Sequence, residues 1–277
     1  MKTLQQAISQ KEGRGGAGQS LRKHLSAVGI IEWDDITRAS LYELRDHLAE
    51  VLAPGTARTI MAHVKSIFNR YSDEVELPKD WAKILTGKAT KPLRTYLTPG
   101  ELVKFENIEA KNDGERVVQV ESLLEAYTGA RVSDIMELTK ENIQDGVLTY
   151  VSKKTKVRAS VPVSGKVERW IEYAQEHRND EPTLKSRNEI IRRLAKKAGI
   201  ADSVTVFRGG RTIKSPKHEQ LSSHSFRISF VTNLQKAGMD MLSIARMAGH
   251  TNTAMTERYC APTTPELSGR AVAYLGI

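Results

Sequence analysis

The chain has 277 residues, 39% of them hydrophobic, which is enough to bury a full core and to form two domains. Its 42 Lys and Arg outnumber its 33 Asp and Glu, and the net charge of +9 favours a polyanionic partner, with nucleic acid first. A single cysteine excludes an intramolecular disulfide and a zinc site built on several thiolates. No apolar run suits a membrane span or a secretion signal, so we expect a soluble, cytoplasmic protein.

The first third of the chain is predicted to be helical. Residues 1–10 suit a short helix, and a glycine-rich break follows them. Two longer helices are expected at about 40–52, after a serine cap, and at 55–71.

The helix predicted at 55–71 has two distinct faces. Its polar face carries Arg58 and Lys65, which would suit a DNA backbone, although an ordinary solvated face has the same composition. Its apolar face is expected in a core and consists of Ala57, Ile60, Met61, Val64, Ile67 and Phe68.

The segment 77–98 contains lysines, prolines and glycine without sustained periodicity, and it is therefore the expected linker. We place the domain boundary near Thr95, between a helical domain at 1–94 and a second domain at 95–277. Thr98 as a cap, with Pro99 at the first helical position and Glu101 at the third, predicts a helix that opens the second domain.

The second domain mixes helices with a β-hairpin. Helices are expected at 115–127 and 132–140, and β-rich runs at 146–152 and 159–163 flank a basic turn. The rest is expected to be mostly helical and to end in a short tail helix at 265–277. The predicted fold class is therefore mainly α with a small β-sheet or hairpin.

Four residues near the C-terminus suit chemistry at a phosphate. His224 and Arg227 lie three apart at the start of a predicted helix, His250 follows the glycine that ends the next helix, and Tyr259 comes nine residues later. Arginine binds phosphate through paired donors, histidine donates or accepts a proton, and tyrosine can be a nucleophile. Taken alone, a histidine just past a helix is usually a cap or a surface residue, so the combination carries the signal.

Together with two upstream features, these residues resemble the catalytic set of the tyrosine recombinase (phage integrase) family. The family has an arginine after a Gly-containing turn, a hairpin lysine, a His-x-x-Arg pair, a Gly-His pair and a tyrosine. This chain has them in order between about 95 and 262, as Arg131, the hairpin around Lys154, His224 with Arg227, Gly249 with His250, and Tyr259. Ile228 stands where many members have a second histidine.

The resemblance implies a fold and a set of roles. Residues 1–94 would be a helical core-binding domain that clamps DNA together with the catalytic domain. Arg131 and Arg227 would stabilise the charge of the phosphoryl group, Tyr259 would attack it and form a 3′-phosphotyrosine, and His250 would hydrogen-bond a phosphoryl oxygen. His224 would be the base, and neither a metal, ATP nor another cofactor would be needed.

The acid that protonates the leaving 5′ oxygen is a hairpin lysine in this family. Lys153, Lys154 and Lys156 all lie in the predicted turn, and counting back from the strand at 161–163 favours Lys154. Lys153 and Lys156 are then expected to bind the DNA backbone, and all three lysines could do so instead.

The implied function is site-specific recombination of double-stranded DNA by a homo-tetramer, through a Holliday junction, with monomers or weak dimers away from DNA. A type IB topoisomerase would use similar chemistry without a partner site. A DNA-binding regulator without catalysis and a metal-dependent nuclease are further alternatives. The nuclease is disfavoured because carboxylates such as Asp134 and Glu137 suit helix-surface or packing positions without clustering.

Overall fold

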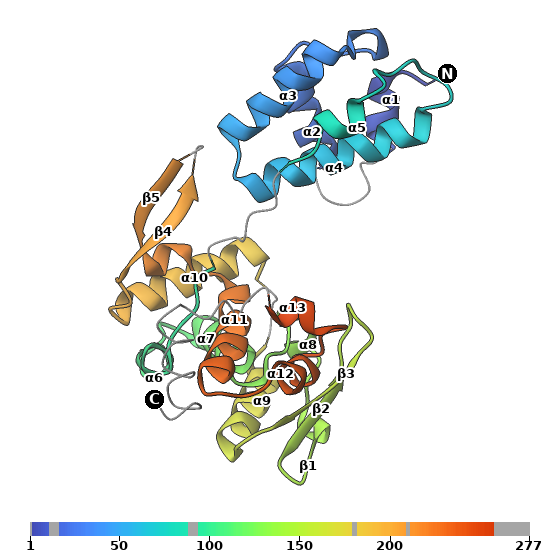
Figure 1. Cartoon of the computed structure of the whole chain (residues 1–277). Coiled ribbons are helices and arrows are strands. Elements are labelled where there is room, and N and C mark those ends of the chain that lie inside the picture. Colours follow the sequence, from blue (N-terminus) through green and yellow to red (C-terminus); the bar gives the residue numbers. More distant parts are fainter. Residues whose placement is uncertain (1, 11–16, 88–93, 179–181, 209–210, 258–277) are drawn as a thin grey trace, which may run out of the picture. The chain divides into compact units, whose positions relative to one another are not determined.

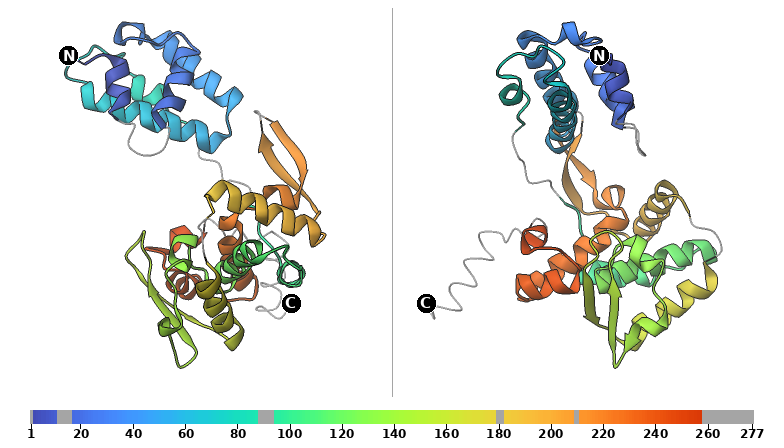
Figure 2. Two further views of the ribbon diagram at one scale, coloured as in Figure 1. Left: turned by 180° about the vertical axis from the view of Figure 1, so that it is seen from behind. Right: turned by 90° about the vertical axis from the view of Figure 1, so that its right-hand side faces the viewer.

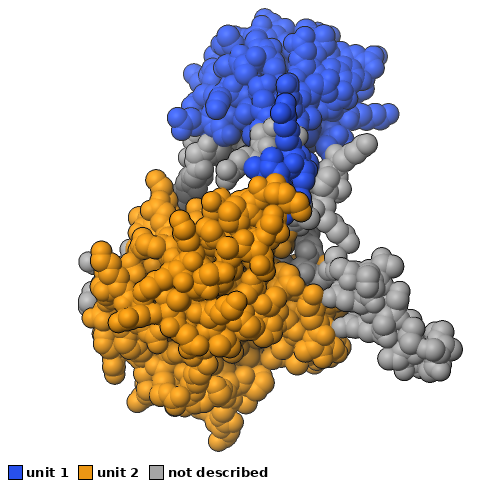
Figure 3. Space-filling model, turned by 90° about the vertical axis from the view of Figure 1, so that its left-hand side faces the viewer, with its two compact units in different colours: residues 1–93, 205–213 blue, residues 94–204, 214–277 orange. Residues whose placement is uncertain are grey.

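The computed structural model describes residues 2–10, 17–87, 94–178, 182–208 and 211–257. Within these ranges the chain is mainly helical with two small sheets, which confirms the predicted fold class (Figure 1). It divides into two compact units, coloured separately in Figure 3. Unit 1 is Met1–Leu93 with Thr205–Ile213, and unit 2 is Arg94–Val204 with Lys214–Ile277.

Unit 1 is built on helices whose apolar faces meet in one core. The six apolar residues predicted on one face of the helix at 55–71 are all buried there, because a stripe of this width leaves water only by packing on neighbouring helices. None of the described helices is long and apolar enough to cross a membrane. The elements are α1 (Leu4–Ser9), α2 (Ala17–Ser26), η1 (Trp33–Asp35), α3 (Arg38–Val51), α4 (Pro54–Tyr71) and α5 (Trp81–Ile84).

Helix α3 begins two residues earlier than predicted, and its cap is a different residue. Thr37 is the N-cap, and its side chain accepts a hydrogen bond from the backbone N–H of Ser40. Ser40 is instead the third helical residue, and its hydroxyl accepts from the backbone N–H of Thr37. The serine cap expected from the sequence was therefore wrong, because a threonine three residues upstream forms a reciprocal box with it.

Unit 2 is organised around helix α7 (Asp113–Thr128), which packs against α6, α8, α9, α10 and α11 (Figure 1). The views from behind and from the side show α9 and α11 along its flanks (Figure 2). Because helices surround it, α7 buries polar residues such as Glu121 and Glu125 as well as apolar ones. The other helices are α6 (Pro99–Glu106), α8 (Val132–Ile135), η2 (Lys140–Asn142), α9 (Gly165–His177), α10 (Leu184–Lys197), η3 (Lys217–Gln220), α11 (Ser223–Lys236), α12 (Met241–Met247) and α13 (Thr253–Glu257).

The predicted hairpin is confirmed and gains a short third strand. Strands β1 (Ile143–Gln144), β2 (Val147–Val151) and β3 (Arg158–Pro162) form an antiparallel sheet in that order. Leu148 pairs with Val161 in this register, and both are buried, so one face of the sheet lies on the core while the turn between β2 and β3 projects from it.

One prediction for the second domain was wrong, and another holds with an addition. Helix α8 ends at Ile135 instead of continuing to Lys140, because Thr139 adopts an extended conformation and caps the separate turn η2. The stretch after the hairpin is mostly helical, as predicted, and it also contains strands β4 (Ser203–Arg208) and β5 (Arg211–Pro216), which form a two-stranded sheet. Alternating β-branched residues around Gly-Gly are typical of such a hairpin, and this signal is present in the sequence.

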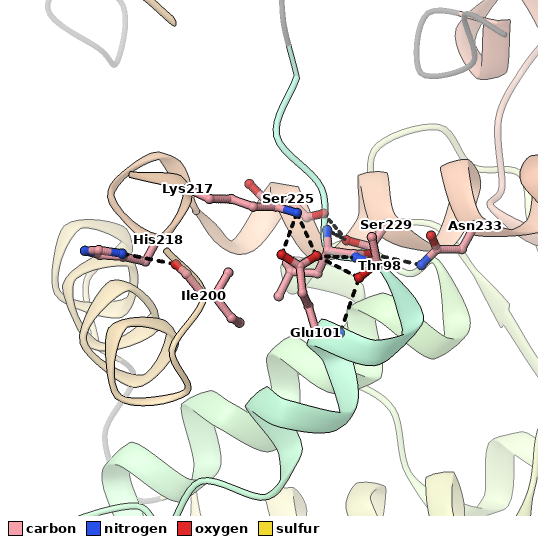
Figure 4. A network of polar contacts seen from close by, with 9 residues as sticks. Thr98, Glu101, Ile200, Lys217, His218, Ser225, Ser229 and Asn233 are labelled. Carbon is pink, nitrogen blue, oxygen red and sulfur yellow. Dashed lines mark hydrogen bonds and ion pairs between the residues drawn. The ribbon is translucent and has the colours of Figure 1, made fainter. Parts of the chain in front are cut away.

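A polar network anchors the start of unit 2 to helix α11 (Figure 4). The backbone N–H of Leu97 donates to Ser229 Oγ at 2.8 Å, and its carbonyl accepts from Asn233 Nδ2 at 3.0 Å. One turn further on, the buried carboxylate of Glu101 accepts from Lys217 Nζ at 2.6 and 2.7 Å. Because Leu97 is held on α11, the residues just before it also lie near that helix.

Candidate active site

Arg227 is a deeply buried cation of the candidate site. It lies on α11 and is only 1% exposed. Its guanidinium donates from Nη1 to the carbonyl of Gly129, just past α7, and from Nη2 to the carbonyl of Ala248 at 2.7 Å, at the end of α12. Both carbonyls belong to helix ends, so the packing of three helices fixes this cation before any ligand binds.

The turn after α7 needs glycine. Gly129 has φ 67°, in the left-handed region, and a Cβ at this position would overlap the ring of Phe230. The turn therefore brings the 129 carbonyl to Arg227 and starts the next segment at Arg131.

Arg131 lies at the N-cap of α8 and is tied to the sheet. Its Nη1 donates to Ser152 Oγ at 2.7 Å and lies 3.9 Å from Asp134 Oδ2. Asp134 is buried, and its carboxylate also accepts from Ser152 Oγ at 3.1 Å and from the backbone N–H of Lys153 at 2.9 Å. The carboxylate predicted to be a packing or surface group thus joins Arg131 to the turn that carries the lysines.

The turn between β2 and β3 presents three exposed lysines, at 153, 154 and 156. The ammonium group of Lys153 forms an ion pair with the carboxylate of Glu137. Thr155 Oγ1 donates to the carbonyl of Gly249 at 3.0 Å, so the turn is attached beside His250. Of the three, Lys154 is the one whose charge contributes to the lowered pKa of His224.

His224 lies in the first turn of α11, and the residue is exposed to solvent. Desolvation by the surrounding atoms lowers its pKa to about 4, and the charges of Arg94, Arg227, Arg131 and Lys154 act in the same direction. The ring is therefore neutral at pH 7. Four cations acting on one imidazole indicate that these side chains converge.

Arg94 is a member of this cluster that the sequence analysis missed. Its Nη1 lies 3.3 Å from His224 Nε2, and because a guanidinium can only donate, Nε2 is the acceptor. Arg94 comes three residues before the anchored Leu97 and 130 residues before His224. No local pattern marks it, since its position follows from the network that holds the start of unit 2 on α11.

Beneath His224, a buried carboxyl of α7 holds the first residue of α11. Ser223 Oγ donates to Glu125 Oε1 at 2.9 Å and to Oε2 at 3.1 Å. Burial raises the pKa of Glu125 to about 8, although Ser223 and the charges of Arg187 and Arg227 oppose this shift. The helix start that carries His224 is thus fixed by α7.

His250 follows α12 and is 5% exposed, so the structure places it in the interior and not at the surface. Desolvation lowers its pKa to about 3, and Arg227, Arg131 and His224 lower it further. Its Nδ1 lies 2.8 Å from Thr256 Oγ1 on α13. The two histidines therefore share the field of the same two arginines.

The remaining predicted residues belong to unit 1 or lie outside the described residues. Tyr259 and the tail helix expected at 265–277 lie outside them. On α4 in unit 1, Arg58 is exposed, whereas Lys65 is half-buried and donates to Thr86 Oγ1 at 3.0 Å. Within the described ranges, no three His, Cys, Asp or Glu side chains are grouped as a metal site requires.

Comparison with known proteins places the chain in a family. The model of the phage integrase family matches residues 103–265. The tyrosine recombinase XerC of Myxococcus xanthus is 26% identical over 234 residues, which cover 78% of this chain and 74% of that protein.

Two solved structures share the fold. The Tn1549 transposon integrase, in complex with transposon right end DNA, superposes with a TM-score of 0.70 at 15% identity and covers 100% of both chains. The lambda integrase tetramer bound to a Holliday junction gives a TM-score of 0.62 at 17% identity, over 94% of this chain and 78% of that one.

Proposed function

This chain belongs to the phage integrase family and is a site-specific DNA recombinase, and we propose that it cleaves and rejoins DNA through a phosphodiester bond to Tyr259. The observation that carries the proposal is that Arg227 binds the carbonyls of residues 129 and 248, two residues before Arg131 and His250. The charges of both arginines also lower the pKa of His224 and of His250. A phosphodiester is the ligand that suits two fixed guanidiniums flanked by neutral imidazoles.

Arg131 and Arg227 are the phosphate clamp. In-line displacement at phosphorus spreads negative charge over the phosphoryl oxygens, and cations already fixed in position stabilise that charge without reorganising. Helix-end carbonyls hold Arg227, and Ser152 and Asp134 hold Arg131. A clamp of this kind supplies charge stabilisation from the protein's own side chains.

Tyr259 is the nucleophile, and His224 is the base that takes its proton. A phenol with a pKa of about 10 reacts as its phenolate, so a base beside it helps. The pKa of His224 near 4 makes the imidazole neutral and ready to accept a proton. The bound phosphodiester adds a negative charge, which raises this pKa and strengthens the base when DNA is in place. His250 donates to a phosphoryl oxygen.

Lys154 is the acid for the leaving 5′ oxygen. It is the turn lysine whose charge reaches His224, whereas Lys153 is paired with Glu137. Because the ion pair between Lys153 and Glu137 is exposed to solvent, Lys153 can exchange it for a backbone phosphate, and Lys156 binds the backbone as well. The 3′-phosphotyrosine keeps the energy of the broken bond, so rejoining needs no ATP.

Double-stranded DNA is the partner, and the protein acts as a multimer. We propose a tetramer on two paired sites with a Holliday-junction intermediate, which the fold shared with the lambda integrase tetramer supports. Away from DNA the protein is a monomer or weak dimer. Residues 1–94 form a DNA-clamping domain that uses Arg58 and Lys65, and 95–277 form the catalytic domain. The single cysteine and the DNA substrate support a cytoplasmic location.

The test is covalent trapping on DNA. The protein is incubated with a library of randomised DNA duplexes that carry a nick. Cleavage near the nick releases a short fragment, which diffuses away and leaves the protein attached to the DNA. We expect an adduct that survives detergent and EDTA, and sequencing of the attached DNA gives the target site. Tyr259→Phe should bind the selected site without forming an adduct, whereas the matched control Tyr173→Phe should react like the wild type.

Two results would contradict the proposal. An adduct that persists in Tyr259→Phe would assign the nucleophile elsewhere. Relaxation of a supercoiled plasmid without the selected site, at catalytic amounts of protein, would favour a topoisomerase over a recombinase.

A further inference from the structure

The hydrogen bond between His250 and Thr256 is buried and joins two elements of the site. Thr256 lies on α13, and its side chain is fully buried, with Oγ1 2.8 Å from Nδ1 of the histidine. Burial excludes water as a competing partner, so the hydroxyl and the ring nitrogen bond to each other, with one as donor and the other as acceptor.

The choice of donor decides which ring nitrogen carries the hydrogen. The pKa of His250 lies near 3, so the ring is neutral at pH 7 and holds one hydrogen, on Nδ1 or on Nε2. A carbonyl or carboxylate partner would accept only and would fix the hydrogen on Nδ1. A threonine hydroxyl can donate, and in that case Nδ1 is the acceptor and the hydrogen lies on Nε2.

The site favours the second arrangement. The charges of Arg131 and Arg227 act on the ring, and the proposed function places an anionic phosphodiester between these two arginines. An Nε2–H can donate to a phosphoryl oxygen, whereas an Nε2 lone pair would face an anion and repel it. Protonating the whole ring would also supply a donor, but burial and the two guanidiniums oppose it.

We propose that Thr256 is a positioning residue which donates its hydroxyl hydrogen to Nδ1 of His250 and thereby keeps a hydrogen on Nε2 for the phosphodiester. The proposal rests on the proposed function, because it assumes a phosphodiester between the two arginines. Thr256 also comes three residues before Tyr259, so the same bond ties the segment leading to the nucleophile to a residue of the site.

The two histidines then have opposite tautomers. Arg94 donates to Nε2 of His224, so that ring holds its hydrogen on Nδ1 and has its lone pair on Nε2. His250 holds its hydrogen on Nε2 and offers a donor. One imidazole is set to accept a proton and the other to bind an oxygen anion, although neither ring carries a charge.

The first experiment reads the tautomer directly in protein without DNA. Nitrogen-15 NMR of histidine-labelled protein distinguishes a protonated from an unprotonated ring nitrogen, and the signals missing from His250→Gln identify the residue. We expect His250 with its hydrogen on Nε2 at pH 7. A wild-type spectrum with the hydrogen on Nδ1 overturns the proposal. This readout needs no activity, so it stands even if the chain forms no adduct with DNA.

The second experiment measures what the hydroxyl contributes to cleavage. Thr256→Val keeps the shape and removes the donor, and Thr256→Ser keeps the donor. On the selected nicked site, we expect Thr256→Val to lower the single-turnover cleavage rate by about tenfold or more while the Kd for DNA stays within about twofold. Thr256→Ser should restore the rate.

Equal cleavage rates for the wild type and Thr256→Val would overturn the proposal. It would also be overturned if Thr256→Ser cleaved as slowly as Thr256→Val while the His250 signals of the serine variant matched those of the wild type. Failure of the wild type itself to form an adduct would instead refute the proposed function. The two failures are therefore separable.

Discussion

The candidate site draws on two parts of unit 2 that hold their side chains in opposite ways. On the helical side, Arg227 is buried and bound to the carbonyls of Gly129 and Ala248. On the sheet side, Lys154 is exposed on a turn. Asp134 and Gly249 hold this turn through the residues on either side of Lys154. A group that stabilises charge gains from being fixed in advance, whereas a proton donor must reach an oxygen that appears only when the bond breaks.

Arg227→Ala tests the fixed side and should have the largest effect. It removes a guanidinium from the clamp and leaves two buried carbonyls without their donor, so we expect cleavage to slow by about 10³-fold and stability to fall by roughly 3 kcal/mol. Arg227→Lys should recover little activity, because one ammonium cannot span both carbonyls. The exposed Arg169 on α9 gives a matched control, and its alanine variant should cleave normally. Single-turnover cleavage and urea unfolding measure both effects, and cleavage within tenfold of the wild type would show that Arg227 is structural only.

Lys154→Ala tests the exposed side, and we expect cleavage to slow by about 10²-fold with little change in stability. If the lysine is the acid, a substrate with sulfur in place of the leaving 5′ oxygen should restore the rate, because a thiolate leaves without a proton. Lys156→Ala should weaken DNA binding and its salt dependence, with no rescue by sulfur. Rescue of Lys156→Ala in place of Lys154→Ala would reassign the acid.

Arg94→Ala tests His224, whose pKa is lowered by cations of both sides, and should have the smallest effect. Removing its positive charge raises the pKa of His224 from about 4 toward its ordinary value, so the ring becomes protonated at a higher pH. A protonated ring cannot act as a base, and the acid limb of the cleavage profile should therefore shift to higher pH. At pH 8 we expect a rate within about threefold of the wild type.

Arg94→Lys keeps the charge and should leave the acid limb in place. Single-turnover rates between pH 4.5 and 8.5 measure both variants. An unchanged limb in Arg94→Ala would show that the rate does not depend on the protonation of His224.

Much of the fold could be predicted because local chemistry determines it. The apolar stripe of α4 and the box formed by Thr98 and Glu101 are written in consecutive residues, and the structure confirms both. The errors arose where two local signals compete. Ser40 suits a cap, but Thr37 lies within reach of it, and Thr139 starts a new turn where helical periodicity alone would continue α8.

The candidate site also contains residues that the sequence identified and features that it could not predict. Residue types and spacing selected Arg131, His224, Arg227 and His250, because the family pattern is carried by short motifs. Arg94 could not be found from the sequence, because its contact depends on backbone hydrogen bonds made by Leu97 to a helix more than a hundred residues away. The burial of His250 was also beyond reach, since a position just past a helix is usually exposed.

Residue 129 must meet three separate structural requirements. Its left-handed φ of 67° turns the chain, the absence of a Cβ leaves room for Phe230, and its carbonyl accepts a hydrogen bond from Arg227. In directed evolution, most positions allow stability to be exchanged for new specificity, but here any side chain damages both at once. A library meant to retarget this recombinase should therefore leave codon 129 untouched.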